Sequence, residues 1–145
     1  MSGNQFRQVT ADFFVAPQLQ AADFAAANAM GIRTIINNRP DGEAADQLTD
    51  AEARALAHSS GLDYVFVPVV TGGMRAEVIA AFAAGVADHP GPHLAYCRSG
   101  TRSCHMWAFA TAANRPVATT LELAQAAGYD LTPAQPMLER LAAGS

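Results

Sequence analysis

Short apolar runs alternate with longer, alanine-rich segments along most of this chain. Runs rich in β-branched and aromatic residues predict strands at residues 6–9, 13–15, 33–37, 64–69 and 93–96. Segments with helical spacing of apolar positions predict helices at residues 19–30, 49–59, 76–88 and 104–110. Helices separate most of the strands, so the pattern predicts an α/β fold with a mostly parallel sheet flanked by helices on both faces.

Turn and capping residues set the ends of these predicted helices. Gly31 follows the first helix, at a position where a left-handed backbone is favoured. Thr49 and Glu52 have the spacing of a capping box at the start of the second helix, and Gly61 ends it. A histidine- and proline-containing turn at residues 89–92 stops the third helix. The last predicted strand, at residues 93–96, therefore begins directly after this turn.

The chain after Asn114 is also predicted to be helical. Thr119 or Thr120 caps a segment that Gly128 terminates, and Thr132, followed by a proline, caps the last helix. No internal repeat, linker or low-complexity segment interrupts the sequence. We therefore expect residues 1–145 to form one phosphatase-like or sulfurtransferase domain.

Composition narrows the classes of function. Half of the 145 residues are hydrophobic and 15% are charged, which favours a packed core over disorder. The net charge of −4 and the absence of a stripe of basic residues argue against nucleic-acid binding. No apolar run approaches the roughly 18 residues of a membrane span. These features favour a protein that acts on small molecules or on other proteins.

The amino terminus and the cysteine count indicate a reducing compartment. Residues 1–5 have neither the basic start nor the apolar core of a signal peptide. Two cysteines, Cys97 and Cys104, provide no disulfide framework. We therefore expect a cytoplasmic protein in which a thiolate nucleophile can survive.

The most informative segment is the loop Cys-Arg-Ser-Gly-Thr-Arg-Ser at residues 97–103. It connects a buried strand to a helix, where backbone N–H groups converge and stabilise an anion. Arg98 and Arg102 add positive charge that favours thiolate over thiol. Cys97 is thus the predicted nucleophile, with Arg102 as its catalytic partner. The predicted anion-binding residues of the loop are Arg98, Ser99, Gly100, Thr101 and Ser103.

The spacing within this loop distinguishes two classes of enzyme. Cysteine phosphatases carry a His-Cys pair and an arginine six positions after the cysteine, whereas rhodanese-type sulfurtransferases use a shorter loop. Here Arg102 comes five positions after Cys97, and Tyr96 precedes the cysteine. A shorter ring of N–H donors suits a persulfide sulfur better than a tetrahedral phosphate. Spacing alone therefore predicts a rhodanese-like loop.

A wider set of motifs resembles the beta-lactamase hydrolase-like phosphatase domain family, which is also catalogued as a sulfur transferase family. The resemblance runs from about residue 6 to residue 107 and is carried by the segments 37–43, 61–64, 67–69 and 95–103. It implies a fold similar to dual-specificity phosphatases. It also implies an association with persulfide dioxygenases or other sulfide-oxidising enzymes, because such domains occur beside those modules.

The loop at residues 70–74 bears on the choice of reaction. Dual-specificity phosphatases carry a general-acid aspartate in the corresponding loop, and such an acid contributes about 10²–10⁴-fold. Val-Thr-Gly-Gly-Met at residues 70–74 holds no carboxylate. Sulfur transfer between good leaving groups needs little acid catalysis, so this absence favours it. Asp41 and Glu43, in the loop at residues 37–43, are the alternative acids for a phosphatase.

Three functions follow from these features. The leading prediction is a sulfurtransferase, in which a Cys97 persulfide carries sulfur from thiosulfate or glutathione persulfide to a thiol or cyanide. The alternative is a tyrosine or dual-specificity phosphatase with a Cys97 phosphocysteine intermediate. The third is a non-catalytic persulfide carrier or sensor, which would need no acid or base besides the cysteine.

The remaining candidates have a structural and a functional interpretation each. Arg39 and Asp41 either form a solvated turn or lie over the pocket and bind substrate. Cys104 is expected to be a core thiol, with a resolving cysteine as the alternative. His105 follows the loop and is a candidate for tuning the thiolate. No histidine or cysteine pair has metal-ligand spacing, so we predict neither a metal nor a cofactor.

Overall fold

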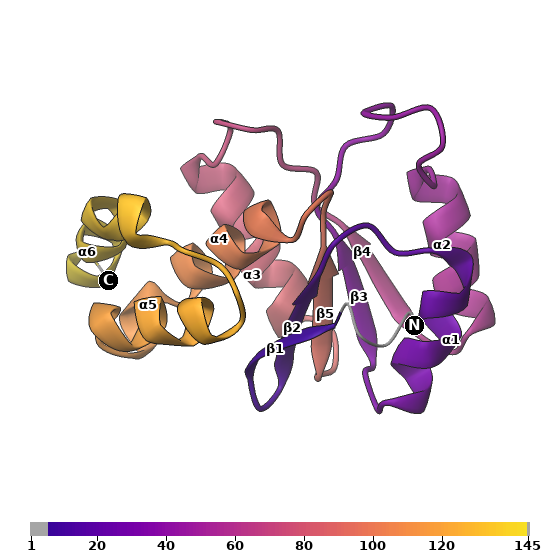
Figure 1. Cartoon of the computed structure of the whole chain (residues 1–145), viewed down its shortest axis with the longest axis horizontal. Coiled ribbons are helices and arrows are strands. Elements are labelled where there is room, and N and C mark those ends of the chain that lie inside the picture. The colour runs from indigo at the N-terminus through magenta and orange to yellow at the C-terminus, as the bar shows by residue number, and fades with distance from the viewer. Residues whose placement is uncertain (1–5, 145) are drawn as a thin grey trace.

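Five short strands form one sheet in the order β1-β2-β5-β3-β4 (Figure 1). The computed structural model describes residues 6–144 and places the strands at β1 (Arg7–Thr10), β2 (Phe13–Ala16), β3 (Thr34–Asn37), β4 (Asp63–Phe66) and β5 (His93–Tyr96). β2, β5, β3 and β4 are parallel, and β1 pairs antiparallel with β2 at one edge. The predicted mostly parallel sheet is confirmed.

Residues 6–144 contain six α-helices: α1 (Ala21–Ala29), α2 (Asp50–Ser59), α3 (Ala76–Ala87), α4 (Thr101–Ala110), α5 (Val117–Ala126) and α6 (Gln135–Ala143). α1 and α2 cover one face and α3 and α4 cover the other, while α5 and α6 pack outside α4 (Figure 1). The α/β fold with helices on both faces is therefore confirmed. Across residues 6–144, none of the helices has the length and apolarity needed to cross a membrane.

Alternation along β5 explains why this strand is apolar throughout. Leu94 and Tyr96 pack with Phe24 in the core beneath α1 and α2. Ala95, between them in sequence, packs with Trp107 in the core beneath α3 and α4. Successive side chains of a strand point to opposite faces, and helices cover both faces here, so every position is buried.

The register of the parallel strands gathers the loops that follow them. Tyr96, the last residue of β5, pairs with Asn37 of β3 on one side and with Ala16 of β2 on the other. The chain segments that leave these three strands therefore start side by side at the carboxyl edge of the sheet. Sites of open α/β sheets form at this edge. Cys97 is the first residue after β5.

Two helix starts after Asn114 differ from the prediction. α5 begins at Val117, directly after Pro116, and Thr120 is buried inside the helix. The proline sets an extended backbone before the first turn and thereby replaces a threonine cap. Thr132 starts a short 3₁₀ turn, η3 (Thr132–Ala134), and its backbone N–H is capped by the carboxylate of Asp130. α6 follows that turn.

β4 is also shorter than predicted. It ends at Phe66, although the apolar run continues to Val69. Pro68 has no N–H to donate and interrupts the ladder. The N–H groups of Val67 and Val69 nevertheless donate to the carbonyls of Asn37 and Asn38, each at 2.9 Å. The segment after β4 is therefore held against β3 as it enters the site.

Candidate active site

The cysteine loop joins β5 directly to the amino terminus of α4. Cys97 is completely buried, and the backbone N–H of Gly100 donates to its Sγ atom at 3.1 Å. Gly100 has a φ of 95°, a left-handed conformation that side-chain-bearing residues rarely adopt. This conformation allows α4 to begin at Thr101, so the positive end of the helix dipole lies at the loop. The geometry favours negative charge on the sulfur.

Contacts from other elements fix the loop in place. The backbone N–H of Gln18 donates to the carbonyl of Arg98 at 3.1 Å, and the hydroxyl of Tyr129 donates to the carbonyl of Ser99 at 3.1 Å. The loop is thus held from the segment after β2 and from the carboxyl-terminal helices.

Asn38 fixes the far end of the loop. Its side-chain carbonyl accepts from the hydroxyl of Ser103 at 2.8 Å, and its amide donates to the carbonyl of Val67 at 2.9 Å. Its backbone N–H donates to the carbonyl of Tyr96 at 2.8 Å. One buried residue therefore connects the ends of β5, β3 and β4 to the first turn of α4.

Arg102 lies between the thiol and an acidic side chain. Its two terminal nitrogens bind both oxygens of Glu43, at 2.8 and 2.9 Å, and one of them also donates to the carbonyl of Val69 at 2.8 Å. The pKa of Arg102 is raised chiefly by the hydrogen bond to Glu43 and then by its interaction with nearby Cys97, against the opposing effect of burial. Arg102 therefore remains a cation beside the sulfur.

Glu43 brings a carboxylate to the site. Besides Arg102 it accepts a hydrogen bond from Nε of Arg39 at 3.0 Å. These contacts, with the Arg102 hydrogen bond as the largest cause, lower its pKa from 4.5 to about 2 despite partial desolvation. Glu43 is thus ionised at neutral pH, and in this state it cannot donate a proton.

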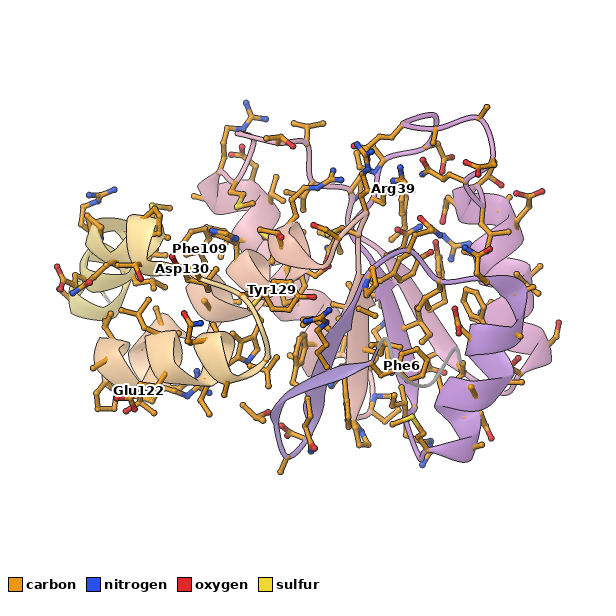
Figure 2. The ribbon with its side chains drawn as sticks, viewed as in Figure 1. Phe6, Arg39, Phe109, Glu122, Tyr129 and Asp130 are labelled. Carbon is orange, nitrogen blue, oxygen red and sulfur yellow. The ribbon has the colours of Figure 1, made fainter. Side chains whose placement is uncertain are left out.

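Arg39 and Asp41 differ in burial and in the groups that they contact. Arg39 is buried and donates to Gln18 at 3.0 Å as well as to Glu43, on the loop at the carboxyl edge of the sheet (Figure 2). Asp41 is exposed and accepts from the backbone N–H of Asp50 at 2.7 Å. Neither residue lines the pocket at the cysteine loop: Arg39 positions Glu43, and Asp41 ties the loop to α2.

An open pocket of about 660 Å³ lies over the cysteine loop. Its lining residues are Glu43, Thr71, Met74, Arg98, Ser99, Thr101, Arg102 and His105. Among the described residues the exposed side chain of Arg98 forms no ion pair, so its charge is available to an incoming anion. Gly100 and Ser103, two of the predicted anion-binding residues, are buried behind this surface.

His105 and Cys104, two further candidates on α4, have different surroundings. Nδ1 of His105 lies 2.8 Å from the carbonyl oxygen of Thr101, and the ring lines the pocket. Cys104 is completely buried in the core, and burial, followed by the charge of Cys97, raises its pKa to about 12. Both cysteines are free. Within residues 6–144 no three His, Cys, Asp or Glu side chains cluster as metal ligands would.

Besides Asn38, two residues that hold the loop were not predicted from the sequence. Gln18 follows β2 at the same edge as Cys97, so the parallel order of the strands could have indicated its position. Tyr129 lies 30 residues from Ser99 on a segment with no local signal for such a contact. Only the packing of the carboxyl-terminal helices against α4 brings it to the loop.

Comparison with known sequences identifies relatives. Residues 5–114 match the family described as beta-lactamase hydrolase-like protein, phosphatase-like domain. A beta-lactamase hydrolase-like protein of Agrobacterium fabrum is 33% identical over 131 residues, which cover 89% of this chain and 30% of that protein. One from Xylella fastidiosa strain 9a5c is 39% identical over 114 residues, which cover 77% of this chain and 26% of that protein. This chain spans less than a third of these relatives.

Solved structures with a similar fold also include phosphatases. A candidate phosphatase of Neisseria meningitidis Z2491 has a TM-score of 0.83 and 31% identity, covering 93% of this chain and 96% of that one. The core catalytic domain of the PP-IP phosphatase SIW14 of S. cerevisiae has a TM-score of 0.66 at 15% identity, covering 93% and 83%. TpbA of P. aeruginosa has a TM-score of 0.65 at 14% identity, covering 99% and 91%. The latter two show a cysteine-phosphatase-like fold.

These findings contradict the predicted sulfurtransferase and the persulfide carrier, and they support the phosphatase alternative. The prediction rested on the position of Arg102 in the sequence and on the missing carboxylate at residues 70–74. Arg102 comes one position early, yet it lies in the first turn of α4, close enough to Cys97 for the sulfur to raise the pKa of Arg102. The missing carboxylate does not exclude a phosphatase, because His105 lines the same pocket. The chain belongs to the family of beta-lactamase hydrolase-like phosphatase-like domains.

Proposed function

We propose that this protein is a cysteine-dependent phosphatase that hydrolyses phosphate monoesters through a Cys97 phosphocysteine. The observation that carries the proposal is the position of Cys97. Its sulfur accepts the Gly100 N–H at the amino terminus of α4, and Arg102, in the first turn of that helix, lies close enough for the sulfur to raise the Arg102 pKa. This arrangement stabilises both a thiolate nucleophile and the anionic group that it attacks.

The first step transfers the phosphoryl group to sulfur. The Cys97 thiolate attacks phosphorus, the bond from phosphorus to the ester oxygen breaks, and the alcohol or phenol leaves with a proton. The backbone N–H groups of the loop and the side chains of Arg98 and Arg102 are placed to stabilise the three outer oxygens. Catalysis of this kind is chiefly positioning and charge stabilisation.

The second step releases phosphate. A water molecule attacks the phosphorus of the phosphocysteine, the bond between sulfur and phosphorus breaks, and inorganic phosphate leaves. Water gives up one proton, and the sulfur departs as the thiolate that the loop stabilises. The nucleophile is thereby regenerated without a change in oxidation state.

Substrate binding requires an exchange at Arg102. In this structure the two oxygens of Glu43 occupy the paired donors of the guanidinium. Phosphate oxygens bind such a fork in the same bidentate manner as a carboxylate. We infer that Glu43 presents Arg102 in a fixed orientation and yields at least one donor to the substrate. Arg98, without an ion pair among the described residues, attracts the dianion first.

We assign delivery of the leaving-group proton to His105. Glu43 and His105 are the pocket-lining side chains whose chemical type serves as a general acid or base, and Glu43 is held ionised by two arginines. In His105, Nδ1 faces the Thr101 carbonyl, which leaves Nε2 for the substrate. The protonated ring would donate to the leaving oxygen and the neutral ring would accept a proton from water.

The test of the proposed function is capture of the intermediate. Purified protein is mixed with p-nitrophenyl phosphate or phosphotyrosine, quenched in acid and weighed by intact mass spectrometry. Phosphotyrosine is included because TpbA, a neighbour in fold, is described in complex with it. We expect turnover and one added phosphoryl group, both abolished by Cys97→Ser. Turnover that survives Cys97→Ser, or no turnover of any phosphate monoester by folded protein, would overturn the proposal.

Leaving-group dependence tests the role of His105. His105→Gln should lower kcat for phenyl phosphate by about 10²-fold or more, because a poor leaving group needs a proton. The same variant should change kcat little for p-nitrophenyl phosphate, whose leaving group is stable as an anion. Equal losses for both substrates would remove His105 from this role. If Glu43→Gln produces the substrate-dependent loss instead, the acid is Glu43.

A further inference from the structure

The peptide group between Ser99 and Gly100 forms a hydrogen bond at its carbonyl and another at its N–H. Its carbonyl accepts a hydrogen bond from the hydroxyl of Tyr129 at 3.1 Å. Its N–H donates to Sγ of Cys97 at 3.1 Å. A trans peptide is planar, so its carbonyl and N–H point in opposite directions. Tyr129 and Cys97 therefore lie on opposite sides of one rigid unit.

We propose that Tyr129 is a positioning residue for the nucleophile, acting through the Ser99–Gly100 peptide to hold the N–H that stabilises the Cys97 thiolate. The inference rests on the proposed role of Cys97 as the nucleophile. A hydrogen bond to a carbonyl polarises the amide, so its N–H becomes a stronger donor. The hydroxyl thus acts on both the direction and the strength of the bond to sulfur.

Tyr129 is itself held firmly from the opposite side. It is buried in the core, and the guanidinium of Arg7 lies over its ring with 5.5 Å between the guanidinium carbon and the ring centroid. Arg7 also donates to the carbonyl of Ala127 at 3.3 Å. Figure 2 shows the Tyr129 ring projecting from the carboxyl-terminal helices toward the body of the sheet. These contacts tie the ring to β1 and to the end of α5.

The hydroxyl remains a donor in the range where a phosphatase works. Burial raises the pKa of Tyr129 to about 12, with the charge of Arg7 opposing and those of Cys104 and Cys97 adding to the effect. A protonated hydroxyl can donate to the Ser99 carbonyl, whereas a phenolate could not. The support from Tyr129 is therefore constant through neutral pH.

Packing against Gly100 makes the contact specific. A Cβ atom added at Gly100 would collide with the Tyr129 hydroxyl and would lie 2.8 Å from Cζ of its ring. The absence of a side chain at Gly100 therefore lets the hydroxyl reach the neighbouring carbonyl. The N–H of Gly100 donates to the sulfur in the same place, and the positive φ of this residue turns the following chain into α4. Tyr129 and Gly100 form one complementary pair.

This role explains what the helices after Asn114 contribute to the site. The family match ends at residue 114, and Tyr129 lies beyond it, between α5 and α6. α5 packs against β1 and α4, and α6 packs against α4 and α5. The segment outside the matched region therefore supplies a contact to the cysteine loop.

The test is the pH dependence of Cys97 alkylation in Tyr129→Phe, which keeps the ring and removes only the hydroxyl. Iodoacetamide reacts with thiolate, and Cys104, whose pKa is about 12, stays protonated. The midpoint of the alkylation profile should move to higher pH. Below the midpoint the rate should fall about threefold, as expected for weakening a hydrogen bond to a charged group. The plateau at high pH should remain at the wild-type rate.

Tyr64→Phe is the matched control. Its hydroxyl is hydrogen-bonded to Asn37 and Asp50, away from the cysteine loop, so the midpoint should stay at the wild-type value. A Tyr129→Phe profile that coincides with wild type would overturn the proposal. A lower plateau with an unchanged midpoint would also overturn it, because that result reports altered access to the thiol.

The alkylation assay separates this inference from the proposed function. A shifted midpoint in a protein that hydrolyses no phosphate monoester would sustain the role of Tyr129 and refute the phosphatase. Hydrolysis of a phosphate monoester by the wild type, together with an unshifted alkylation midpoint in Tyr129→Phe, would sustain the phosphatase and refute the role of Tyr129. Circular dichroism and thermal melting establish that each variant is folded before alkylation is measured. If Tyr129→Phe is less stable than wild type, alkylation of both proteins is measured at a temperature below its melting transition.

Discussion

Replacing Glu43 with Gln should destabilise the protein most at neutral pH and progressively less as the pH falls toward about 2. Glu43 binds both terminal nitrogens of Arg102 and Nε of Arg39, and both arginine side chains are largely buried. Glutamine is neutral, so the two cations would lose their counterion. Protonated glutamic acid is neutral too, and the wild-type protein loses the same interaction in acid.

The magnitude follows from the pKa of Glu43. A decrease from 4.5 to about 2 corresponds to about 3 kcal/mol at most. The Glu43 side chain is 29% exposed, and water screens its ion pairs, so we expect about 1–2 kcal/mol. A carboxyl whose pKa is depressed by folding contributes this stability above its unfolded pKa. The contribution is then lost as the pH falls from about 4.5 through about 2.

Urea unfolding at pH 7, 5 and 3 measures the effect. The difference in the free energy of unfolding between wild type and Glu43→Gln should be largest at pH 7 and should shrink toward pH 3. Glu77→Gln is the control, because the ion pair between Glu77 and Arg75 is 69–75% exposed and should contribute little at any pH. Equal destabilisation at all three pH values, or the same effect in both variants, would refute the reasoning.

Three further substitutions probe the loop. Arg102→Lys loses the bidentate fork and should lower kcat for p-nitrophenyl phosphate by about 10²-fold or more, with a folded circular dichroism spectrum. Gly100→Ala places a methyl group against Tyr129 at a φ of 95°, and should lower the free energy of unfolding by more than about 1 kcal/mol and abolish turnover. Cys104→Ala removes a buried thiol outside the proposed chemistry, and should keep kcat within about twofold while lowering stability by about 1 kcal/mol. The assigned geometry would be contradicted by a wild-type kcat in Arg102→Lys or by wild-type stability in Gly100→Ala. Inactivity of Cys104→Ala would contradict it as well.

Much of the sheet could be predicted because its signals are local. The strand at residues 93–96 was predicted with the bounds that the structure shows, since its apolar run is delimited by prolines and by the cysteine loop. Thr49 and Glu52 likewise form the predicted capping box, because the residues that satisfy one another are three positions apart. The start of α5 depends instead on Pro116, so the predicted cap at Thr119 or Thr120 was wrong.

The site could be predicted only in part, because its decisive contacts join distant segments. Cys97 and Arg102 were found from one short motif, but the partner of Arg102 was not. Glu43 reaches it from a loop 59 residues away, where Arg39 holds the carboxylate in place. The reaction was predicted wrongly because the spacing between Cys97 and Arg102 and the missing carboxylate at residues 70–74 were taken to favour sulfur transfer, whereas the family match and a similar solved structure support a phosphatase.

The hydrogen bonds of Asn38 have a consequence for motion. This side chain accepts from Ser103 and donates to Val67, while its backbone N–H is bonded to Tyr96. Segments joined in this way open as one cooperative unit, and their amide protons exchange with solvent at the rate of the unit. We therefore expect the amide of Asn38 to exchange as slowly as those of β3 and β5. The anion site would then be lost only when the centre of the sheet unfolds, and substrate would meet a cradle that is already assembled.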